Sequence, residues 1–189
     1  AVNGTLILRF GNVQALQGKS SVGSLTAAML DRGAGAFGRQ QIADRFEALK
    51  ANVSISGSDE RLTVRFETRR EHLPDLLALL RTVLRMPTFP ANELETLRAT
   101  SIAGIESQRK QPGALAPNAL GRHGNPYPPG DPRYTPTFDE SVAALKSVSV
   151  DSLRDFHARF YGTEHAQLAI VGDFDAADAV RQSDYLFGD

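Results

Sequence analysis

Two short segments in which apolar and polar residues alternate constrain the fold of this chain more than any other feature. They are residues 53–56, Val-Ser-Ile-Ser, and residues 62–66, Leu-Thr-Val-Arg-Phe. Of the five residues between them, the first four, Gly57–Glu60, have the composition of a turn. Because a period of two places the apolar side chains on one face of a strand, the pattern predicts an antiparallel hairpin with one buried face.

The segments on either side of this hairpin extend it into a mixed fold. Residues 5–10 and 168–171 predict strands, the second a buried one. Helical periodicity covers residues 22–30, 39–50, 73–84, 90–105 and 150–161, with Ser149 as a predicted N-cap. Seven of the ten prolines fall within residues 111–136, which predicts a short helix at 115–120 and then a surface loop. The order of elements favours an α+β fold, a two-layer sandwich of a mainly antiparallel β-sheet packed with helices.

Composition narrows the possible partners. The chain has 21 basic and 22 acidic residues, and this balance argues against nucleic acid as a partner. No apolar run reaches the roughly 20 residues that a transmembrane helix needs. Without cysteine the chain has neither disulfides nor thiolate metal ligands.

Residues 33–38, Gly-Ala-Gly-Ala-Phe-Gly, match the glycine pattern of dinucleotide-binding loops. Such a loop must follow a strand, so that the pyrophosphate meets the N-terminus of a helix. Here the preceding residues predict a helix and no βαβ unit follows. We therefore expect a turn between helices, and a nucleotide-dependent enzyme is the less favoured alternative.

The histidines do not form a metal-binding pattern. His72, His123, His157 and His165 are at least eight residues apart, so no helix presents two imidazoles one turn apart. The chain also lacks the Gly-x-Ser-x-Gly pattern of serine hydrolases. The sequence thus predicts no catalytic residue and no metal site in this chain.

Two polar pairs are candidates for contact with a peptide or a partner protein. Arg69 and Arg70 follow the second hairpin strand, where adjacent guanidinium groups could meet a carboxylate. Arg133 and Tyr134 combine charge and an aromatic ring in the proline-rich loop, a composition that suits a contact surface. A solvated strand end and a purely structural loop are the respective alternatives.

The ordered set of segments resembles the insulinase/pitrilysin family of zinc metallopeptidases, the inverted zincins. The helical run 24–33 is similar to their zinc helix, in which His-x-x-Glu-His precedes Met-Leu and then a glycine. Here Met29, Leu30 and Gly33 occupy the latter positions. Further matching segments are residues 39–42, 49–51, 87–90, 111–112, 125–127, 160–161 and 170–175.

The resemblance implies that the zinc site is vacated. The two histidine positions fall on Ser24 and Ala28, and the general-base position falls on Ala27. The distal glutamate position falls on Gly104, and Glu106 would lie about 200° around the helix from it. Since alanine and glycine have no side-chain ligand atom, the resemblance implies the metal-free, non-catalytic half of such a peptidase.

A set of expectations follows from the resemblance. Residues 1–175 would form the inactive peptidase-like half-domain, and residues 176–189 the start of a second unit that is truncated at the C-terminus. The half-domain would pair with a catalytic half that holds the zinc, in the same polypeptide or as a separate subunit, and would bind peptide substrate in the chamber between them. The family favours a periplasmic or membrane-associated location in a Gram-negative bacterium. The alternative is a purely structural assembly module with no associated proteolysis.

Overall fold

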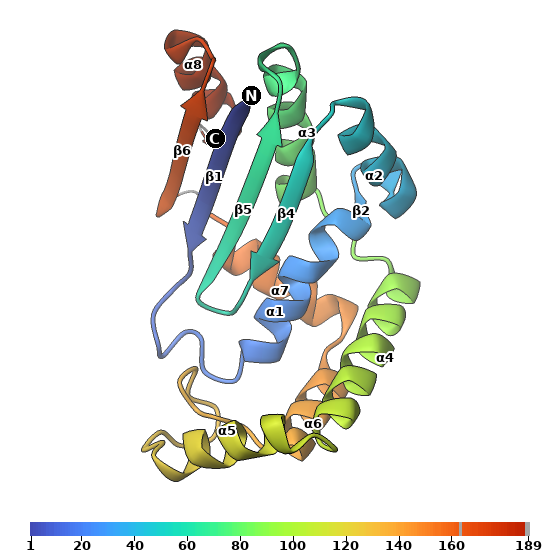
Figure 1. Ribbon diagram of the computed structural model, residues 1–189, viewed down its shortest axis with the longest axis vertical. Helices are drawn as coiled ribbons and strands as arrows, with labels where there is room; N and C mark the ends of the chain where they lie inside the picture. Colours follow the sequence, from blue (N-terminus) through green and yellow to red (C-terminus); the bar gives the residue numbers. More distant parts are fainter. Residues whose placement is uncertain (163, 188–189) are drawn as a thin grey trace.

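An antiparallel four-stranded sheet, with the order β4-β5-β1-β6, forms one layer of the structure (Figure 1). The structure is a computed structural model that describes residues 1–162 and 164–187. The strands are β1 (Val2–Arg9), β4 (Asn52–Gly57), β5 (Arg61–Thr68) and β6 (Ala166–Gly172). Every pairing in this sheet is antiparallel. The predicted α+β class and the predicted hairpin, β4 with β5, are therefore confirmed.

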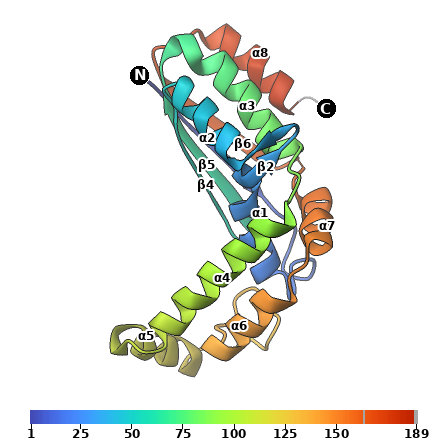
Figure 2. The ribbon, with the colours of Figure 1, turned by 90° about the vertical axis from the view of Figure 1, so that its right-hand side faces the viewer.

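The helices lie on one side of the sheet only, and those within residues 91–147 extend beyond its end (Figure 1 and Figure 2). Before the hairpin lie α1 (Ser20–Met29), the short helix η1 (Leu30–Arg32) and α2 (Arg39–Ala48). After it follow η2 (Arg70–His72), α3 (Leu73–Arg85), α4 (Ala91–Gln108), α5 (Pro112–His123), α6 (Phe138–Ser147), α7 (Val150–Phe160) and α8 (Ala176–Phe187). None of the helices in the described part of the chain is both long and apolar enough to span a membrane.

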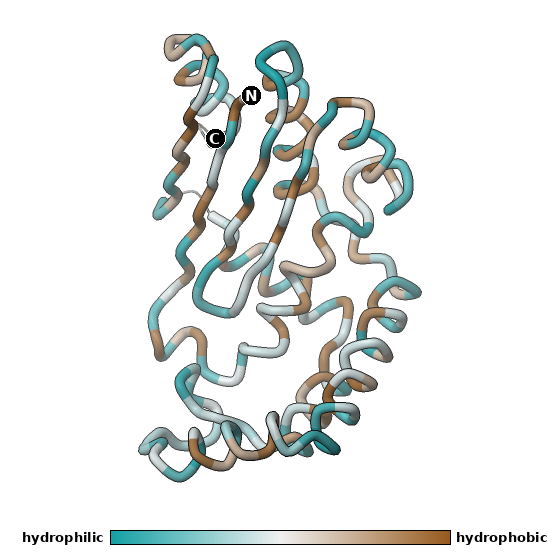
Figure 3. The backbone as a smooth tube through the Cα atoms, in the orientation of Figure 1, coloured by the Kyte–Doolittle hydropathy of each residue, from teal (hydrophilic) through white to brown (hydrophobic). Residues whose placement is uncertain are grey.

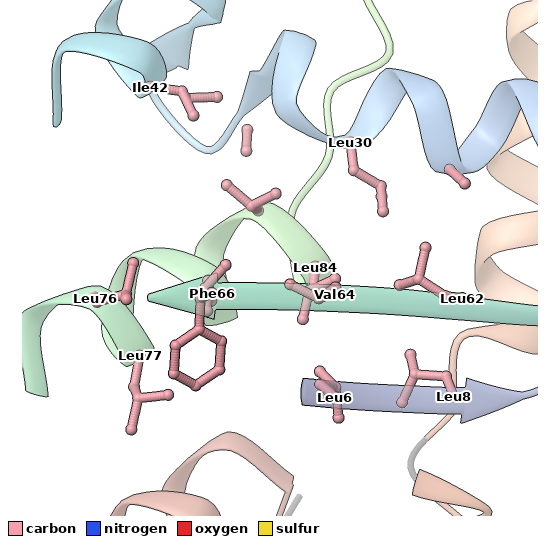
Figure 4. Close-up of a cluster of buried hydrophobic side chains, with 14 of the residues drawn as sticks. Leu6, Leu8, Leu30, Ile42, Leu62, Val64, Phe66, Leu76, Leu77 and Leu84 are labelled. Carbon is pink, nitrogen blue, oxygen red and sulfur yellow. The ribbon is translucent and has the colours of Figure 1, made fainter. Parts of the chain in front are cut away.

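The main core lies between the sheet and the helices (Figure 4). Alternate residues of β1 and β5 point into it, and the residues between them face outward, as the alternating hydropathy of the strands shows (Figure 3). Leu30, Leu76 and Val83 meet them from the helical layer, and each is fully buried. A second cluster joins α1 to α4, α6 and α7 around Leu25, Met29 and Leu153.

The predicted buried strand at residues 168–171 is instead an edge strand. None of the residues of β6 is buried, and Val171 is 71% exposed. The reason is topological, since β6 pairs with β1 on one side and lies at the end of the sheet order. The other edge is β4.

The proline-rich region differs from the prediction in two ways. The short helix predicted at residues 115–120 extends over Pro112–His123 and contains Pro117. Helix α6 was not predicted, although its N-terminus carries a capping box: Thr137 Oγ1 accepts from Glu140 N at 3.0 Å, and Glu140 Oε2 accepts from Thr137 N at 2.7 Å. The predicted N-cap Ser149 is confirmed by its hydrogen bond from Ser152 N at 3.1 Å.

Two contacts hold the outer helices in place. The guanidinium group of Arg98 in α4 donates to the carbonyl of Leu145 at 3.2 Å and of Val148 at 2.5 Å, at the C-terminal end of α6. Helix α8 lies beside α3, where the guanidinium group of Arg81 is 4.5 Å from the centre of the Tyr185 ring. The division of the chain at residue 175 stays a prediction, and the last two residues of the segment 176–189 lie outside the described residues.

Candidate functional site

Helix α1 places the three positions of the predicted vacated site on adjacent turns. Ser24 is exposed, Ala28 is half-buried, and Ala27 is only 1% exposed. The helix needs no zinc for its position, because Leu25 and Met29 anchor it in the second cluster while Ala27 and Leu30 belong to the main core. The helix thus carries small side chains at the predicted metal positions, and the correspondence of these positions to a metal site stays a prediction.

Ala27 lies directly against the edge strand β4. A Cβ atom added to Gly57 would come within 2.7 Å of the Ala27 Cβ, a distance that real structures do not tolerate. Helix and strand therefore approach each other through a glycine and an alanine. Since Ala27 is almost completely buried, a longer side chain at this position would have to displace β4 or α1.

The N-terminal end of α1 is tied to the turn of the hairpin. The hydroxyl of Ser20 donates to the buried carboxylate of Asp59 at 2.8 Å. Gly23 permits the close approach, because a Cβ atom there would lie 2.5 Å from the Asp59 Cα. This hydrogen bond and the close approach connect the turn to the helix.

The glycine run after α1 forms a small hairpin rather than a nucleotide loop. Strands β2 (Gly33–Ala34) and β3 (Phe37–Gly38) pair with each other, and Gly35 between them has a φ of +56°. The backbone of this hairpin also bonds the segment after α3, since Gly35 N donates to Met86 O at 2.8 Å and Thr88 N donates to Gly33 O at 2.9 Å. The glycines serve turn geometry and close packing, and a helix rather than a strand precedes them.

Gly104, the predicted distal position, lies on the exposed side of α4. No heavy atom lies within 4 Å of a Cβ atom built there. Glu106 is engaged elsewhere, with its carboxylate 3.6 Å from Arg109 Nε. The residues at the four vacated positions supply one exposed serine hydroxyl and no imidazole or carboxylate, so they do not fit a zinc ion.

A charged group joins the C-terminal end of α1 to the start of α4. The guanidinium group of Arg32 donates to Ala28 O at 3.1 Å and to the carboxylate of Glu93 at 2.9 Å, and Arg39 lies 3.6 Å from the same carboxylate. Burial raises the pKa of Asp31 above its ordinary value, against the attraction of Arg32 and Arg39. These ions brace the helices.

Among the described residues, no three histidine, cysteine, aspartate or glutamate side chains gather in a way that could hold a metal ion.

His157 has a structural position in α7. Its Nε2 lies 2.7 Å from Leu84 O, and because a carbonyl only accepts, Nε2 carries the proton. The ring packs against Tyr161 at 4.7 Å between centroids. Burial lowers the pKa of His157 below its ordinary value, and the hydrogen bond to Leu84 opposes this shift. The imidazole therefore joins α7 to the end of α3.

The two predicted contact pairs belong to segments at opposite ends of the molecule, the end of β5 and the loop between α5 and α6 (Figure 1). At the end of β5, Arg70 forms an ion pair of 2.8 Å with Asp173, which follows β6, and Arg69 lies 3.9 Å from Glu71. Both pairs are exposed, so the guanidinium groups remain accessible to a partner. Their contact role stays a prediction.

The loop with Arg133 and Tyr134 is well braced. Asn125 donates to Arg133 O and to Thr135 Oγ1, both at 2.8 Å, which gives the Asn-Pro-Tyr segment a structural purpose that sequence reasoning missed. The guanidinium group of Arg133 lies 3.8 Å from the centre of the Tyr127 ring and bonds Asp131 through two nitrogens at 2.8 Å. This pairing lowers the pKa of Asp131 to about 2.

Tyr134 lines a hollow of about 300 Å³ between this loop, α6 and the start of α1. Its hydroxyl lies 3.1 Å from the carboxylate of Glu140. Hydrogen bonds to that carboxylate, of which the one donated by Thr137 N has the largest effect, lower its pKa. Ser20 and Ser21 also line the hollow. The hollow combines hydroxyl groups, carboxylates and apolar prolines, a surface suited to a polypeptide segment.

Two comparisons with known proteins name the peptidase M16 inactive domain. Residues 147–189 match the model of the peptidase M16 inactive domain. The structure is similar to the peptidase M16 inactive domain from Pseudomonas fluorescens, with a TM-score of 0.84 and 26% sequence identity over 99% of this chain. It is also similar to a protease from Helicobacter pylori, with a TM-score of 0.79 and 13% identity over 98% of this chain. A third similar structure is the periplasmic protease PqqL from Escherichia coli, with a TM-score of 0.76 and 17% identity over 97% of this chain.

The chain is less than half as long as these structures. It covers 45% of the Pseudomonas fluorescens chain, 44% of the Helicobacter pylori chain and 21% of PqqL. No curated protein sequence matches it.

Proposed function

We propose that this chain belongs to the M16, or insulinase-type, peptidase family and is part of the non-catalytic half of a zinc metallopeptidase, because residues 147–189 match the M16 inactive domain and the whole fold is similar to a solved inactive domain. In this role it would pair with a zinc-bearing half, wall the chamber between them and hold the peptide substrate. Zinc would be held by the partner half alone. The whole protein would then be a zinc metalloendopeptidase although this chain has no activity of its own.

One observation carries the proposal: α1 keeps its place while its metal positions hold Ser24, Ala27 and Ala28. Its contacts with β4 and with the second cluster maintain the helix without a metal. Loss of ligands together with retention of the helix is expected when a domain has a binding or pairing role.

Peptide would contact the edge strand β4, which lies beside α1 and has one unpaired side. An extended peptide can add to such an edge through backbone hydrogen bonds. The proposed side-chain contacts with peptide or partner are of two kinds. Tyr134 lines the hollow near the start of α1, with Arg133 beside it in the same loop, and Arg69 and Arg70 follow the end of β5. A periplasmic location is proposed by analogy with PqqL, which is described as periplasmic.

The test is reconstitution with the zinc-bearing half of the same organism. The chain alone should cleave no fluorogenic peptide and should contain well under one zinc per chain by elemental analysis. The two halves together should show peptidase activity that a chelator abolishes. Chelator-sensitive activity or stoichiometric zinc in this chain alone would refute the proposal, and a stable complex without proteolysis would favour the structural assembly module.

A further inference from the structure

The hollow of about 300 Å³ that Tyr134 lines has walls from three segments of the chain. They are residues 18–22 at the start of α1, residues 129–136 of the loop after α5, and helix α6. Gly18 N donates to Gly130 O at 2.7 Å, and the two segments lie side by side in Figure 1 and Figure 2. This hydrogen bond fixes the position of the loop relative to the start of α1.

The hydroxyl groups in the walls present acceptors to the hollow. Of the four serines that line it, three donate their protons within the chain, Ser20 to a carboxylate and Ser141 and Ser147 to backbone carbonyls, at 2.8–2.9 Å. The hydroxyl of Tyr134 donates to the carboxylate of Glu140. A hydroxyl has one proton and two lone pairs, so each of these oxygens can still accept a hydrogen bond but cannot donate another. The hollow therefore fits a ligand that donates several hydrogen bonds.

The charge of the walls is negative. Among the described residues that line the hollow, none is lysine, arginine or histidine, and the two acidic ones are Asp131 and Glu140. Arg133 neutralises Asp131, whereas Glu140 has no ion pair within the described part of the chain. The carboxylate of Asp59, which accepts from the Ser20 hydroxyl, adds a second negative charge at the edge of the hollow. A cation is therefore the favoured ligand.

The N-terminus of α1 acts in the opposite sense. The free N–H groups of a first helical turn carry about half a positive charge in total, which favours an anion. The carboxylates of Glu140 and Asp59 carry two full negative charges, so they outweigh the helix terminus. An anion would be repelled from the hollow, and a cation would be attracted to it.

Apolar groups in the walls suit the stem of a long side chain. Val22, Pro129, Pro136 and Ala144 line the hollow together with the polar groups. Arginine and lysine bury their methylene stems against apolar surface while the charged head meets polar groups. Arginine has five N–H donors and no acceptor, which complements the oxygens of the hollow better than the three donors of lysine.

We propose that the hollow binds an arginine side chain of a polypeptide segment, whose guanidinium group donates to Glu140 and to the hydroxyl oxygens of Ser20 and Ser141. This inference rests on the proposed function in one respect, since the polypeptide is the peptide substrate named there. Binding in the hollow needs neither zinc nor a catalytic half. It can therefore be measured on this chain alone.

The test uses the whole chain and acetylated, amidated tripeptides with arginine, lysine or citrulline between two alanines, followed by the amide signals in nuclear magnetic resonance spectra. Citrulline has the shape of arginine without its charge. The arginine peptide should bind saturably and shift the signals of residues 18–22 and 129–147. The citrulline peptide should bind at least about fivefold more weakly, a modest factor because Glu140 is exposed and its charge is partly screened. Equal binding of these two peptides, or stronger binding of the lysine peptide or of spermidine, would overturn the inference.

Variants of the chain place the binding in the hollow. Glu140→Gln should weaken binding of the arginine peptide at least about fivefold, and the amide oxygen can still accept from Thr137 N, so that α6 keeps its cap. Ala144→Leu, which fills part of the hollow and removes no charge, should weaken it as well. The matched control is Glu47→Gln, an exposed carboxylate of α2, which should leave the affinity unchanged.

The outcomes separate this inference from the proposed function. Unchanged affinity of the folded Glu140→Gln and Ala144→Leu variants, or signal shifts confined to other segments, would overturn the inference even if the reconstituted halves cleave peptide. Arginine-dependent binding in the hollow would support it, and reconstituted halves without proteolysis would then contradict the proposed function alone.

Discussion

The close contact of α1 with β4 is most directly tested by the substitution Gly57→Ala. The added methyl group would lie 2.7 Å from Ala27 Cβ, 3.1 Å from Arg61 O and 3.2 Å from Leu62 Cδ1. The two nearest of these atoms are a helix-borne methyl group and a backbone oxygen, neither of which can rotate away. The clash must therefore be relieved by a shift of the strand or the helix.

The expected cost follows from two opposing effects. Overpacking of a close-packed interior costs about 1–3 kcal/mol. Replacing glycine with alanine also restricts the conformations of the unfolded chain, which stabilises the folded state by about 0.4–1 kcal/mol. We therefore expect the free energy of unfolding to fall by about 1–2 kcal/mol, which for a chain of this size lowers the melting temperature by about 2–8 °C.

A double-mutant cycle shows whether Ala27 is the cause. Ala27→Gly alone should cost about 1 kcal/mol for glycine in a helix and about 0.8 kcal/mol for the lost methyl group. The double variant Ala27→Gly/Gly57→Ala moves the methyl group from helix to strand, so it should be more stable than the sum of the single changes by at least about 0.5 kcal/mol. The measurement is urea denaturation followed by circular dichroism.

The control is Gly104→Ala, where an added Cβ meets no atom within 4 Å. In an exposed helix interior this change should stabilise the chain by about 0.5–1 kcal/mol. Additive effects of Ala27→Gly and Gly57→Ala, or a Gly57→Ala variant as stable as the wild type, would refute the reasoning that the vacated position packs against β4.

Three further predictions concern neighbouring parts of the molecule. Ala27→Glu should destabilise the chain by more than Gly57→Ala, because it adds a buried carboxylate to the steric conflict. Ser24→His, on the exposed side of α1, should change the free energy of unfolding in urea by less than about 0.5 kcal/mol. Arg98→Ala should lower the free energy of unfolding by about 1.5–3 kcal/mol and speed hydrogen exchange in α6, because the guanidinium group bonds two carbonyls at the end of that helix. Arg98→Lys should not restore both bonds, and unchanged hydrogen exchange in either variant would contradict this role. The pKa of His157 is lower in the folded than in the unfolded chain, so the unfolded chain binds the proton first as the pH falls. The contribution of His157 to the stability of the fold should therefore be complete above the ordinary pKa of about 6.5 and decrease below it. His157→Gln should flatten this part of the pH profile of the melting temperature.

Local sequence patterns were sufficient for most of the elements. The alternation in residues 53–66 and the cap at Ser149 depend on neighbours only a few residues apart, and the structure contains both. Helix α6 could have been found from the same kind of signal, Thr137 followed three residues later by Glu140. The absence of side-chain ligand atoms at Ala27, Ala28 and Gly104 is also a property of the sequence alone, because alanine and glycine lack such atoms in any fold.

The tertiary structure decided what no local pattern contains. The apolar run of β6 is compatible with a central or an edge strand, and only its pairing with β1 alone makes it an edge. The hollow is lined by Ser20 and Glu140, from helices more than one hundred residues apart in the chain. In the same way, the contact of Ala27 with Gly57 joins a helix to a strand that follows it only after a second helix. Residue identity thus determined which chemistry is absent, whereas long-range packing determined which surfaces remain for binding, because burial and charge neighbours are properties of the assembled chain.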